Sequence, residues 1–379
     1  PRFTIRIISG VFEGEANDLV IAQSLACPED ELRLLSWLHI FSSRVGDFRR
    51  SLELARISQG VVENIQHDGA RTAVDWMFSA TYHALGQQLE AQQHAEAAMR
   101  RSSSASVQEY LKDYGIGQRV RYLTVHARIL WLRGLPEQAE ALVKQAILEA
   151  EDRQHPLALC LAYMYAATIS IWRGDLSAAI ERIDRLMACV AANAMAPFQA
   201  IAVGLRGQVA VQRGEMAEGI ADLRAALPRL DEEKYLLLSS EFMRALAEAL
   251  AANGYIEEGL EVPGRAFAEV EKHGEKYQLA DLYRARSLLG GGTVESDLLE
   301  AISIAEKQGA LGWKLRAALP LADLWGRTGR SVEAERLLRE ALEGFADSNK
   351  DCDVQAARTL VTSLMKARPE KVARSRKAV

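Results

Sequence analysis

The histidines and cysteines are the residues most able to do chemistry in this sequence, and their spacing predicts no catalytic or metal site. No two histidines have the HExxH spacing that puts two ligands on one helical face, and the cysteines form no CxxC pair. The chain also lacks GxSxG and GxxxxGK[ST] motifs. We therefore predict a protein that is not an enzyme and carries no metal or cofactor. The scattered residues are His39, His67, His83, His94, His126, His155, His273, Cys27, Cys160, Cys189 and Cys352.

Three arginines each precede a glycine at a regular interval: Arg133, Arg173 and Arg213. A cation at the C-terminal end of a helix satisfies terminal carbonyls and favours the helix dipole, so capping is the first interpretation. A ladder of guanidinium groups that meets an acidic partner is the second. The glycine triplet at 290–292 has no preceding strand and no Lys-Ser/Thr pair, so it predicts a turn and not a phosphate cradle.

These arginines belong to a repeat that runs through most of the chain. Counted from Gly134, small residues occur seven before (Ala127), five after (Ala139) and twelve after (Ala146). Similar glycines stand at positions 46, 86, 174, 214, 254 and 329, with the triplet in the place of another. A helix of about fifteen residues, a glycine turn and a second such helix fill this period of about 40 residues. With only 9 prolines in 379 residues, the composition agrees with helix throughout.

The small residues predict where the two helices of one unit cross. A side chain larger than a methyl group at the crossing would force the axes beyond the usual separation of roughly 8–10 Å. Glycine at both positions, as in Gly207 and Gly219, lets the pair close. Larger residues such as Ile180 and Ile183 are expected to fill the seams between units.

Three segments depart from the repeat. Residues 1–30 contain part of a further hairpin, and residues 350–365 are expected to form a final helix. The long interval between Gly86 and Gly134 contains SSSAS at 102–106, which predicts a longer surface loop. The domain prediction is a TPR-like helical repeat domain over 1–365, followed by a basic, disordered tail over 366–379.

The pattern of Ala127, Gly134, Ala139 and Ala146 resembles the tetratricopeptide repeat (TPR) over roughly residues 30–346. This resemblance implies an all-α fold, a right-handed α-α superhelix (TPR-like solenoid) of about eight helical hairpins. The period is longer than the family's 34 residues, and the proline that closes the second helix is mostly absent.

A narrower resemblance lies in three segments: WRGDLSAAIERIDRL (172–186), LRGQVAVQRGEMAEGIADLRAAL (205–227) and GALGWKLRAALPLADLWGRTGRSVEAERLL (309–338). They are similar to the C-terminal helical-repeat region of large bacterial regulators, in which a winged-helix DNA-binding domain or a nucleotide-cyclase domain precedes an AAA (STAND-type) ATPase. The resemblance implies a sensor or interaction module. Neither a winged helix nor the ATPase phosphate loop is present in this sequence.

The TPR resemblance also implies where a ligand would bind. In such an array the first helices line the concave face, and set positions before each glycine point into it. A mixed polar surface interrupted by a tryptophan suits a protein or peptide partner or a small-molecule effector. A solvated concave surface without a dedicated ligand is the alternative. The predicted groove residues are Arg121, Thr124, Arg128, Thr168, Trp172, Gln208, Gln212, Arg244 and Glu248.

Composition narrows the class of partner. A formal net charge of −5 argues against a surface built to hold nucleic acid, and no apolar stretch is long enough to span a membrane. The separated cysteines fit reduced, buried thiols in the cytoplasm. We therefore predict a protein-interaction or ligand-sensing module, the C-terminal regulatory part of a bacterial transcriptional regulator. A free-standing scaffold or adaptor that joins protein partners is the alternative.

Overall fold

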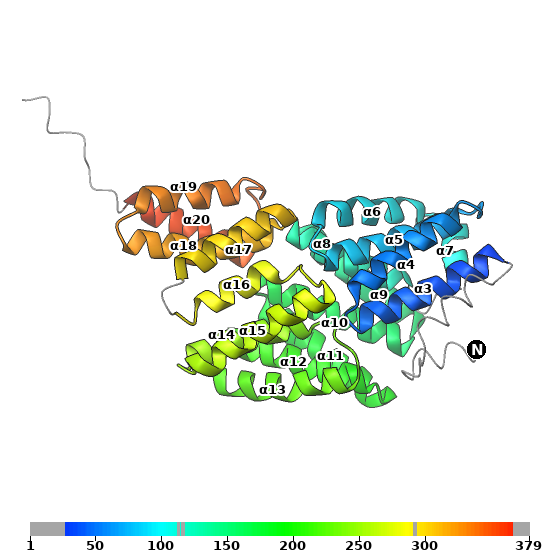
Figure 1. The fold of residues 1–379 in the computed structure, drawn as a ribbon, viewed down its shortest axis with the longest axis horizontal. Coiled ribbons are helices and arrows are strands. Elements are labelled where there is room, and N and C mark those ends of the chain that lie inside the picture. The colour runs from blue at the N-terminus through cyan, green and yellow to red at the C-terminus, as the bar shows by residue number, and fades with distance from the viewer. Residues whose placement is uncertain (1–26, 112–113, 115–117, 291–293, 367–379) are drawn as a thin grey trace, which may run out of the picture.

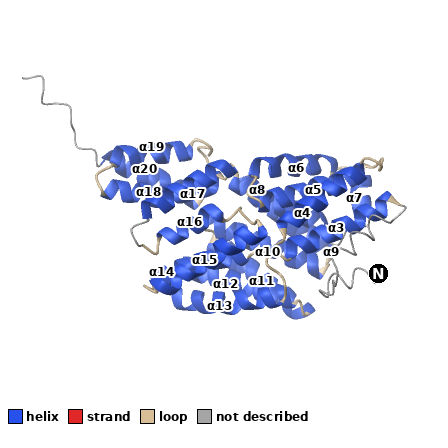
Figure 2. Ribbon diagram, in the orientation of Figure 1, coloured by secondary structure: helices blue, strands red, loops and turns tan. Residues whose placement is uncertain are grey.

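The structure, a computed structural model, describes residues 27–111, 114, 118–290 and 294–366 (Figure 1). These residues form eighteen α-helices and, within those ranges, no strand (Figure 2). The predicted partial hairpin in residues 1–26 and the basic tail beyond residue 366 lie outside the described residues. The helices are α3 (Pro28–Arg44), α4 (Phe48–Val62), α5 (Asp68–Ala84), α6 (Gln88–Arg101), α7 (Ala105–Leu111), α8 (Gln118–Leu132), α9 (Pro136–Arg153), α10 (Pro156–Arg173), α11 (Leu176–Asn193), α12 (Ala196–Gln212), α13 (Met216–Glu232), α14 (Ser239–Ala252), α15 (Ile256–His273), α16 (Leu279–Ser287), α17 (Val294–Gln308), α18 (Leu311–Arg327), α19 (Ser331–Leu342) and α20 (Cys352–Lys366).

Sixteen of these helices pair with their chain neighbour as eight hairpins: α3–α4, α5–α6, α8–α9, α10–α11, α12–α13, α14–α15, α16–α17 and α18–α19. Helix α20 packs against α18 and α19 and ends the array, as the sequence predicted. The fold prediction, an all-α TPR-like superhelix of about eight hairpins, is confirmed. In the described part of the chain, no helix is both long and apolar enough to cross a bilayer.

Each hairpin turn contains a glycine in the left-handed region of backbone conformation. The φ angles of these eight glycines run from +73° at Gly174 to +84° at Gly329. An L residue is strained there because its Cβ approaches the following carbonyl oxygen. At Gly134 the turn closes with hydrogen bonds from the backbone N–H of Gly134 to Trp131 O (3.0 Å) and from that of Leu135 to Leu130 O (2.9 Å). The repeat of glycines therefore encodes the turns.

The small residues lie where the two helices of a hairpin cross. A Cβ on Gly219 would lie 2.6 Å from Val211 Cγ2, and one on Gly207 would lie 3.0 Å from Leu223 Cγ. A methyl group at either place would therefore push α12 and α13 apart. The seam prediction is right for Ile183, which is buried, and wrong for Ile180, which is exposed to solvent.

The segment predicted as a surface loop contains the short helix α7. Val107 and Leu111 share one face of this helix because they are four residues apart, and both are buried against α5. Tyr114 is fully buried beside them, and Tyr110 stacks on His67 with ring centroids 4.1 Å apart. The loop prediction was therefore wrong, because the apolar residues that follow the serine run bury a face of their own.

The solenoid turns back on itself, so its first half (α3–α11) packs against its second half (α12–α20). The backbone N–H of Leu236 donates to Arg44 O (2.8 Å), and that of Lys276 donates to Ala84 O (2.7 Å). A third contact joins Arg133 Nη1 to Gly309 O (2.8 Å). In each case a glycine turn of the first half meets a connection between two hairpins of the second half.

This docking distinguishes two sets of glycine turns. The closed turns, at Gly46, Gly86, Gly134 and Gly174, lie against the other half: a Cβ on Gly174 would sit 2.8 Å from Cys352 Sγ. The open turns, at Gly214, Gly254, Gly290 and Gly329, are different, because a Cβ there would meet no described atom within 4 Å.

The three arginines before the glycines do not form a ladder, because each contacts a different partner; all three lie at the C-terminal end of a helix, as the capping interpretation requires. Arg133 donates to the Gly309 carbonyl of the other half, and Arg173 Nη1 lies 3.2 Å from a carboxylate oxygen of Glu140. Arg213, at an open turn, pairs with Glu215 across 2.9 Å. Of these three contacts, only the one made by Arg133 joins the two halves, and the other two lie within a half.

The prediction that the cysteines are buried is wrong for two of the four. Cys27 and Cys352 are exposed, whereas Cys160 is buried, with its Sγ 3.5 Å from that of Cys189. All four are free thiols.

Candidate ligand-binding cavity

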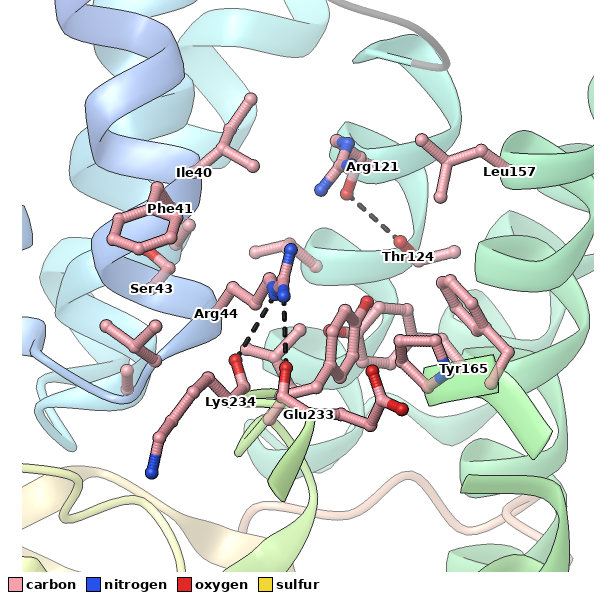
Figure 3. A pocket seen from close by; sticks show the side chains of 18 of the residues that line it. Ile40, Phe41, Ser43, Arg44, Arg121, Thr124, Leu157, Tyr165, Glu233 and Lys234 are labelled. Carbon is pink, nitrogen blue, oxygen red and sulfur yellow. Dashed lines mark hydrogen bonds between the residues drawn. The ribbon is translucent and has the colours of Figure 1, made fainter. Parts of the chain in front are cut away.

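A cavity of about 1070 Å³ lies in the hollow of the first half of the solenoid, where it meets the second half (Figure 3). Its wall is built by α3, α5, α8, α10, the start of α12 and the connection at 232–237. Ligand sites in proteins typically enclose roughly 300–1,000 Å³, so the space suits a small molecule or a short peptide. The first helices of successive hairpins form much of this wall, as expected for a concave face.

Eight aromatic residues contribute to the wall of the cavity. Helix α10 supplies Tyr165 from a segment that is apolar around its whole circumference, because it is packed on all sides. Aromatic rings offer large apolar faces at a small cost in side-chain entropy. The other aromatic residues of the wall are Trp37, Phe41, Phe48, Trp76, Phe198, Tyr235 and Tyr277.

Three of the predicted groove residues, Arg121, Thr124 and Arg128, lie in the cavity wall. They share one face of α8 because they are three and four residues apart. The Thr124 hydroxyl donates to Val120 O (2.9 Å) and Arg121 O (3.1 Å), which fixes this side chain on the helix. Their role in ligand binding stays a prediction.

Arg128 joins the cavity to a buried polar network. Its guanidinium lies over the ring of Tyr277 (4.7 Å to the centroid) and 3.7 Å from Glu241 Oε1. Glu241 also accepts hydrogen bonds from Tyr277 Oη (2.8 Å) and Trp172 Nε1 (3.3 Å). Burial raises the pKa of Glu241, and Arg128 opposes that shift.

Glu275 stands beside this network in the cavity wall. Burial raises the pKa of its carboxyl to about 7, although Arg128 favours the charged form, and the neighbouring Glu241 raises the pKa further. The Glu275 carboxyl is therefore partly protonated near neutral pH.

Arg44 was not predicted and comes from a distant part of the chain. Its Nη2 donates to Glu233 O (3.0 Å) and its Nε to Lys234 O (3.2 Å), as Figure 3 shows. These bonds hold α3 against the connection between α13 and α14. They make one side of the cavity from segments about 190 residues apart.

Three other predicted groove residues, Thr168, Trp172 and Gln208, are buried outside the cavity wall. Trp172 packs in a cluster with Trp131 (centroids 5.0 Å apart) and Trp313 (5.2 Å apart). Gln208 Nε2 donates to Glu241 O (3.3 Å), and Thr168 Oγ1 to Met164 O (3.1 Å). These side chains pack in the interior and do not line the cavity.

The last three predicted groove residues also lie away from the cavity. Gln212 Nε2 donates to Ile171 O (3.2 Å). Arg244 pairs with Glu248 (2.8 Å) and with Asp281 (3.1 Å), and Arg284 completes the group. Burial alone would raise the pKa of Asp281, but Arg284 and Arg244 hold it at about 2. These charged side chains are therefore paired with one another and do not line the cavity.

A cluster of potential metal ligands, Asp351, Cys352 and Asp353, lies at the start of α20. Its carboxylates already have protein partners: Asp351 accepts from Trp131 Nε1 (3.1 Å) and Asp353 from Arg316 Nε (2.7 Å). The Trp131–Asp351 bond joins the two halves of the solenoid, and the Arg316–Asp353 bond joins α18 to α20 within the second half; we assign no metal to these residues.

Most of the cavity wall could not be found from the repeat alone. The missing residues come from α3, from the start of α12 and from inter-hairpin connections. One signal was available: Tyr235 and Tyr277 are large aromatic residues in connections, where polar residues are the rule. Both are buried, because their connections face the hollow and not solvent.

No protein-family model matches this sequence. An uncharacterized protein, R02095, from Rhizobium meliloti is 25% identical over 253 residues, which are 65% of this chain and 25% of that protein. The ATP-dependent DNA helicase RecG of Acidithiobacillus ferridurans is 27% identical over 145 residues, 36% of this chain and 18% of the helicase. The chain therefore spans a quarter or less of the length of either relative.

Among solved structures, a Rap protein complexed with Competence and Sporulation Factor has a similar fold, with a TM-score of 0.59 at 12% identity. The match covers 95% of this chain and 89% of the Rap chain. Yeast Tom70 matches at a TM-score of 0.42 and 13% identity, over 95% of this chain and 69% of Tom70. The likeness to the Rap protein supports the helical-repeat fold.

Proposed function

We propose that the chain is a ligand-sensing helical-repeat module, and that a peptide or a small-molecule effector occupies the cavity. The observation that carries the proposal is the position of the cavity between the two halves of the solenoid. An occupant would contact α8 and α10 of the first half and residues 232–237 of the second half. Because it touches both, it would favour one packing of the halves over another, which is how binding becomes a signal.

The proposal is tested by filling the cavity. Ala80 lies in its wall, so Ala80→Phe reduces the free volume, whereas Ala217→Phe adds the same ring on the exposed side of α13. We expect hits from a thermal-shift screen of short peptides and small organic compounds to stabilise the native chain and Ala217→Phe but not Ala80→Phe. Hits that stabilise Ala80→Phe equally would show that the cavity is not the site.

We further propose that the module is the C-terminal regulatory part of a cytoplasmic bacterial transcriptional regulator. Support comes from the three segments that resemble such regulators and from the Rhizobium relative, which is about four times longer than the matched region. The sequence of the complete gene product tests this. A winged-helix domain and an ATPase upstream of residue 1 are expected, and their absence would remove this part of the proposal.

A scaffold that joins protein partners is the second candidate. Exposed apolar residues at the start of α15, namely Tyr255, Ile256 and Leu260, favour it because they lie beside an open turn. For this function we expect a partner captured by the native chain to be lost on Tyr255→Lys with Leu260→Lys, and to be retained by Ala80→Phe.

A further inference from the structure

The guanidinium of Arg121 is the polar group of the cavity that lacks a protein counter-charge. Arg121 lies in the first turn of α8, and among the described residues its buried Nε has no hydrogen-bond partner. Burial lowers the pKa of Arg121, and the groups that oppose this shift are the phenols of Tyr235 and Tyr165, not carboxylates. Arg121 therefore faces the cavity as a cation without an ion pair in the described structure.

The other two arginines of the wall, Arg44 and Arg128, have protein partners. Arg44 donates to the backbone carbonyls of Glu233 and Lys234, and Arg128 lies beside Glu241 and over Tyr277. Figure 3 shows the side chain of Arg121 apart from the bonds made by Arg44, on the opposite side of the open space. The Nε and Nη2 atoms of Arg128 also lack hydrogen-bond partners, but Arg128 lies 3.7 Å from the carboxylate of Glu241. Of the three, Arg121 is the one that has neither a hydrogen bond at its Nε nor a carboxylate partner among the described residues.

The neighbouring side chain of His39 provides no negative charge to balance Arg121. His39 is fully buried, and burial lowers its pKa to about 3, with the positive charge of Arg121 as a further cause. Its Nε2 is already hydrogen-bonded to Thr81 Oγ1 (2.8 Å). Since a neutral imidazole cannot balance a guanidinium, compensation has to come from the cavity side.

Two helix starts add to the positive character of the cavity. Helix α12 begins at Ala196 without a side-chain cap at Met195, whereas α10 begins at Pro156 and is capped by His155 Nδ1, which accepts from the backbone N–H of Leu157 (3.2 Å); both ends lie in the wall. Each helix N-terminus carries a partial positive charge of roughly half a unit. Of the acidic residues in the wall, Glu232 and Glu233 are exposed, and Glu275 is only partly ionised near neutral pH because burial raises its pKa to about 7.

We infer that the cavity binds a ligand with a carboxylate on Arg121 and an aromatic or branched apolar body against Trp76, Tyr165 and Phe198. This inference rests on the proposed function of the cavity and names the chemistry of its ligand. A guanidinium suits this role because it binds a carboxylate through two parallel N–H donors. The carboxylate belongs to a small organic acid or to the C-terminus of a short peptide, since both present the same group.

Matched acids and amides test the inference by calorimetry on the whole chain. The probes are 1-naphthoate, 1-naphthamide, N-acetyl-Leu-Leu-Phe and its C-terminal amide. We expect each acid to bind at least about tenfold more tightly than its amide, the discrimination that charge-assisted hydrogen bonds provide. If 1-naphthoate binds more tightly than N-acetyl-Leu-Leu-Phe, the ligand is a small organic acid, and the reverse order indicates the C-terminus of a peptide.

Arg121→Gln is expected to remove this preference and to leave the affinity for the amides unchanged. The control is Arg119→Gln on the same helix, because Arg119 pairs with Glu149 (2.7 Å) and lies outside the cavity wall. This control should keep the preference. In the ligand-free chain, Arg121→Gln should raise the melting temperature because it removes a buried charge without a partner, an effect opposite to that of losing a structural arginine.

Equal binding of acids and amides, or a preference that survives Arg121→Gln, would overturn the inference and leave the cavity proposal intact. No binding of any of the four probes would overturn it as well. The proposed function is overturned only if hits from the thermal-shift screen stabilise Ala80→Phe as much as the native chain. The two failures are therefore distinguishable.

Discussion

The two halves of the solenoid use the same hairpin for different purposes. In the first half the closed turns are pressed against the second half, as at Gly134, where an added Cβ would lie 3.3 Å from Gly344 O. In the second half the open turns, such as Gly254, face no described atom within 4 Å. The repeat unit is similar in both, but only in the first half do the turns lie against later parts of the chain in the described structure.

The difference shows that contacts between halves, and not only between neighbours, hold this array together. In a simple solenoid each unit contacts its neighbours alone, and stability is the sum of local terms. Here the cluster of Trp131, Trp172 and Trp313 joins hairpins that are far apart in sequence. The cavity lies in the same joint, so a ligand there acts where the halves meet.

The largest expected effect is at the tryptophan cluster. Trp131→Ala removes a buried ring that contacts Trp313 (centroids 4.9 Å apart), and it leaves Asp351 without its indole donor. We expect a loss of about 3–5 kcal/mol in the free energy of unfolding, measured by urea titration. The control is Trp325→Ala in the second half, where the ring is partly exposed and hydrogen-bonded to Glu295, and it should cost less than half as much. Equal losses of free energy of unfolding in the two variants would show that contacts between the halves contribute no more to stability than contacts within the second half.

The next effect is a pH dependence of opposite sign at two carboxyl groups of the second half, one in the joint between the halves and one outside it. Glu275 in the joint has its pKa raised by burial to about 7, so the folded chain keeps a proton that the unfolded chain loses above about pH 4.5. Stability should therefore fall by roughly 2 kcal/mol as the pH rises from about 4.5 to 7, and Glu275→Gln should remove this fall.

Glu295, which is partly exposed and lies outside the joint, is the matched comparison. Hydrogen bonds from Arg330 and Trp325 lower its pKa, so its stabilisation is present above the ordinary pKa and is lost as the pH falls through the lowered one. Thermal melts of Glu275→Gln and Glu295→Gln between pH 3 and 8, roughly the range in which carboxyl groups titrate in proteins, should diverge from the native chain in opposite directions. A pH dependence of the melting temperature that changes in the same direction in both variants would contradict this prediction.

The third effect compares glycine turns. Gly174→Ala and Gly254→Ala should each cost about 1–2 kcal/mol because alanine is strained at positive φ. Gly174→Ala should cost a further 1 kcal/mol or so, since its Cβ would overlap Cys352 Sγ. Denaturation midpoints of the two variants measure the difference. A smaller loss at Gly174 than at Gly254 would mean that the closed turn is loosely packed.

The smallest effect concerns Arg44, which holds α3 against the connection between α13 and α14. Arg44→Met removes hydrogen bonds to Glu233 O and Lys234 O and should cost about 1 kcal/mol. Arg213→Met at an open turn breaks only a half-exposed ion pair with Glu215 and should change stability by less than about 0.5 kcal/mol. Hydrogen exchange at Leu236, whose amide bonds to Arg44 O, should speed up in the first variant alone.

Sequence reasoning predicted the candidate site in part. Spacing on one helical face was enough to group Arg121, Thr124 and Arg128, and these three do lie together in the cavity wall. The same rule applied to later hairpins selected Trp172 and Arg244, which pack at the axis. A positional rule for the concave face assumes an open groove, and it fails where the superhelix coils tightly enough to fill its own centre.

What the sequence by itself determined is the unit: glycine at the turn, small residues such as Gly207 and Gly219 at the helix crossing, and about eight copies of the hairpin. These are local features, because φ at one residue and the contact of adjacent helices depend on nearby residues alone. Only the tertiary structure decided which turns are closed, that Arg44 reaches Lys234 and that a cavity remains around Arg121. Those outcomes depend on the coil of the whole array, in which small rotations at each hairpin add up over some 190 residues.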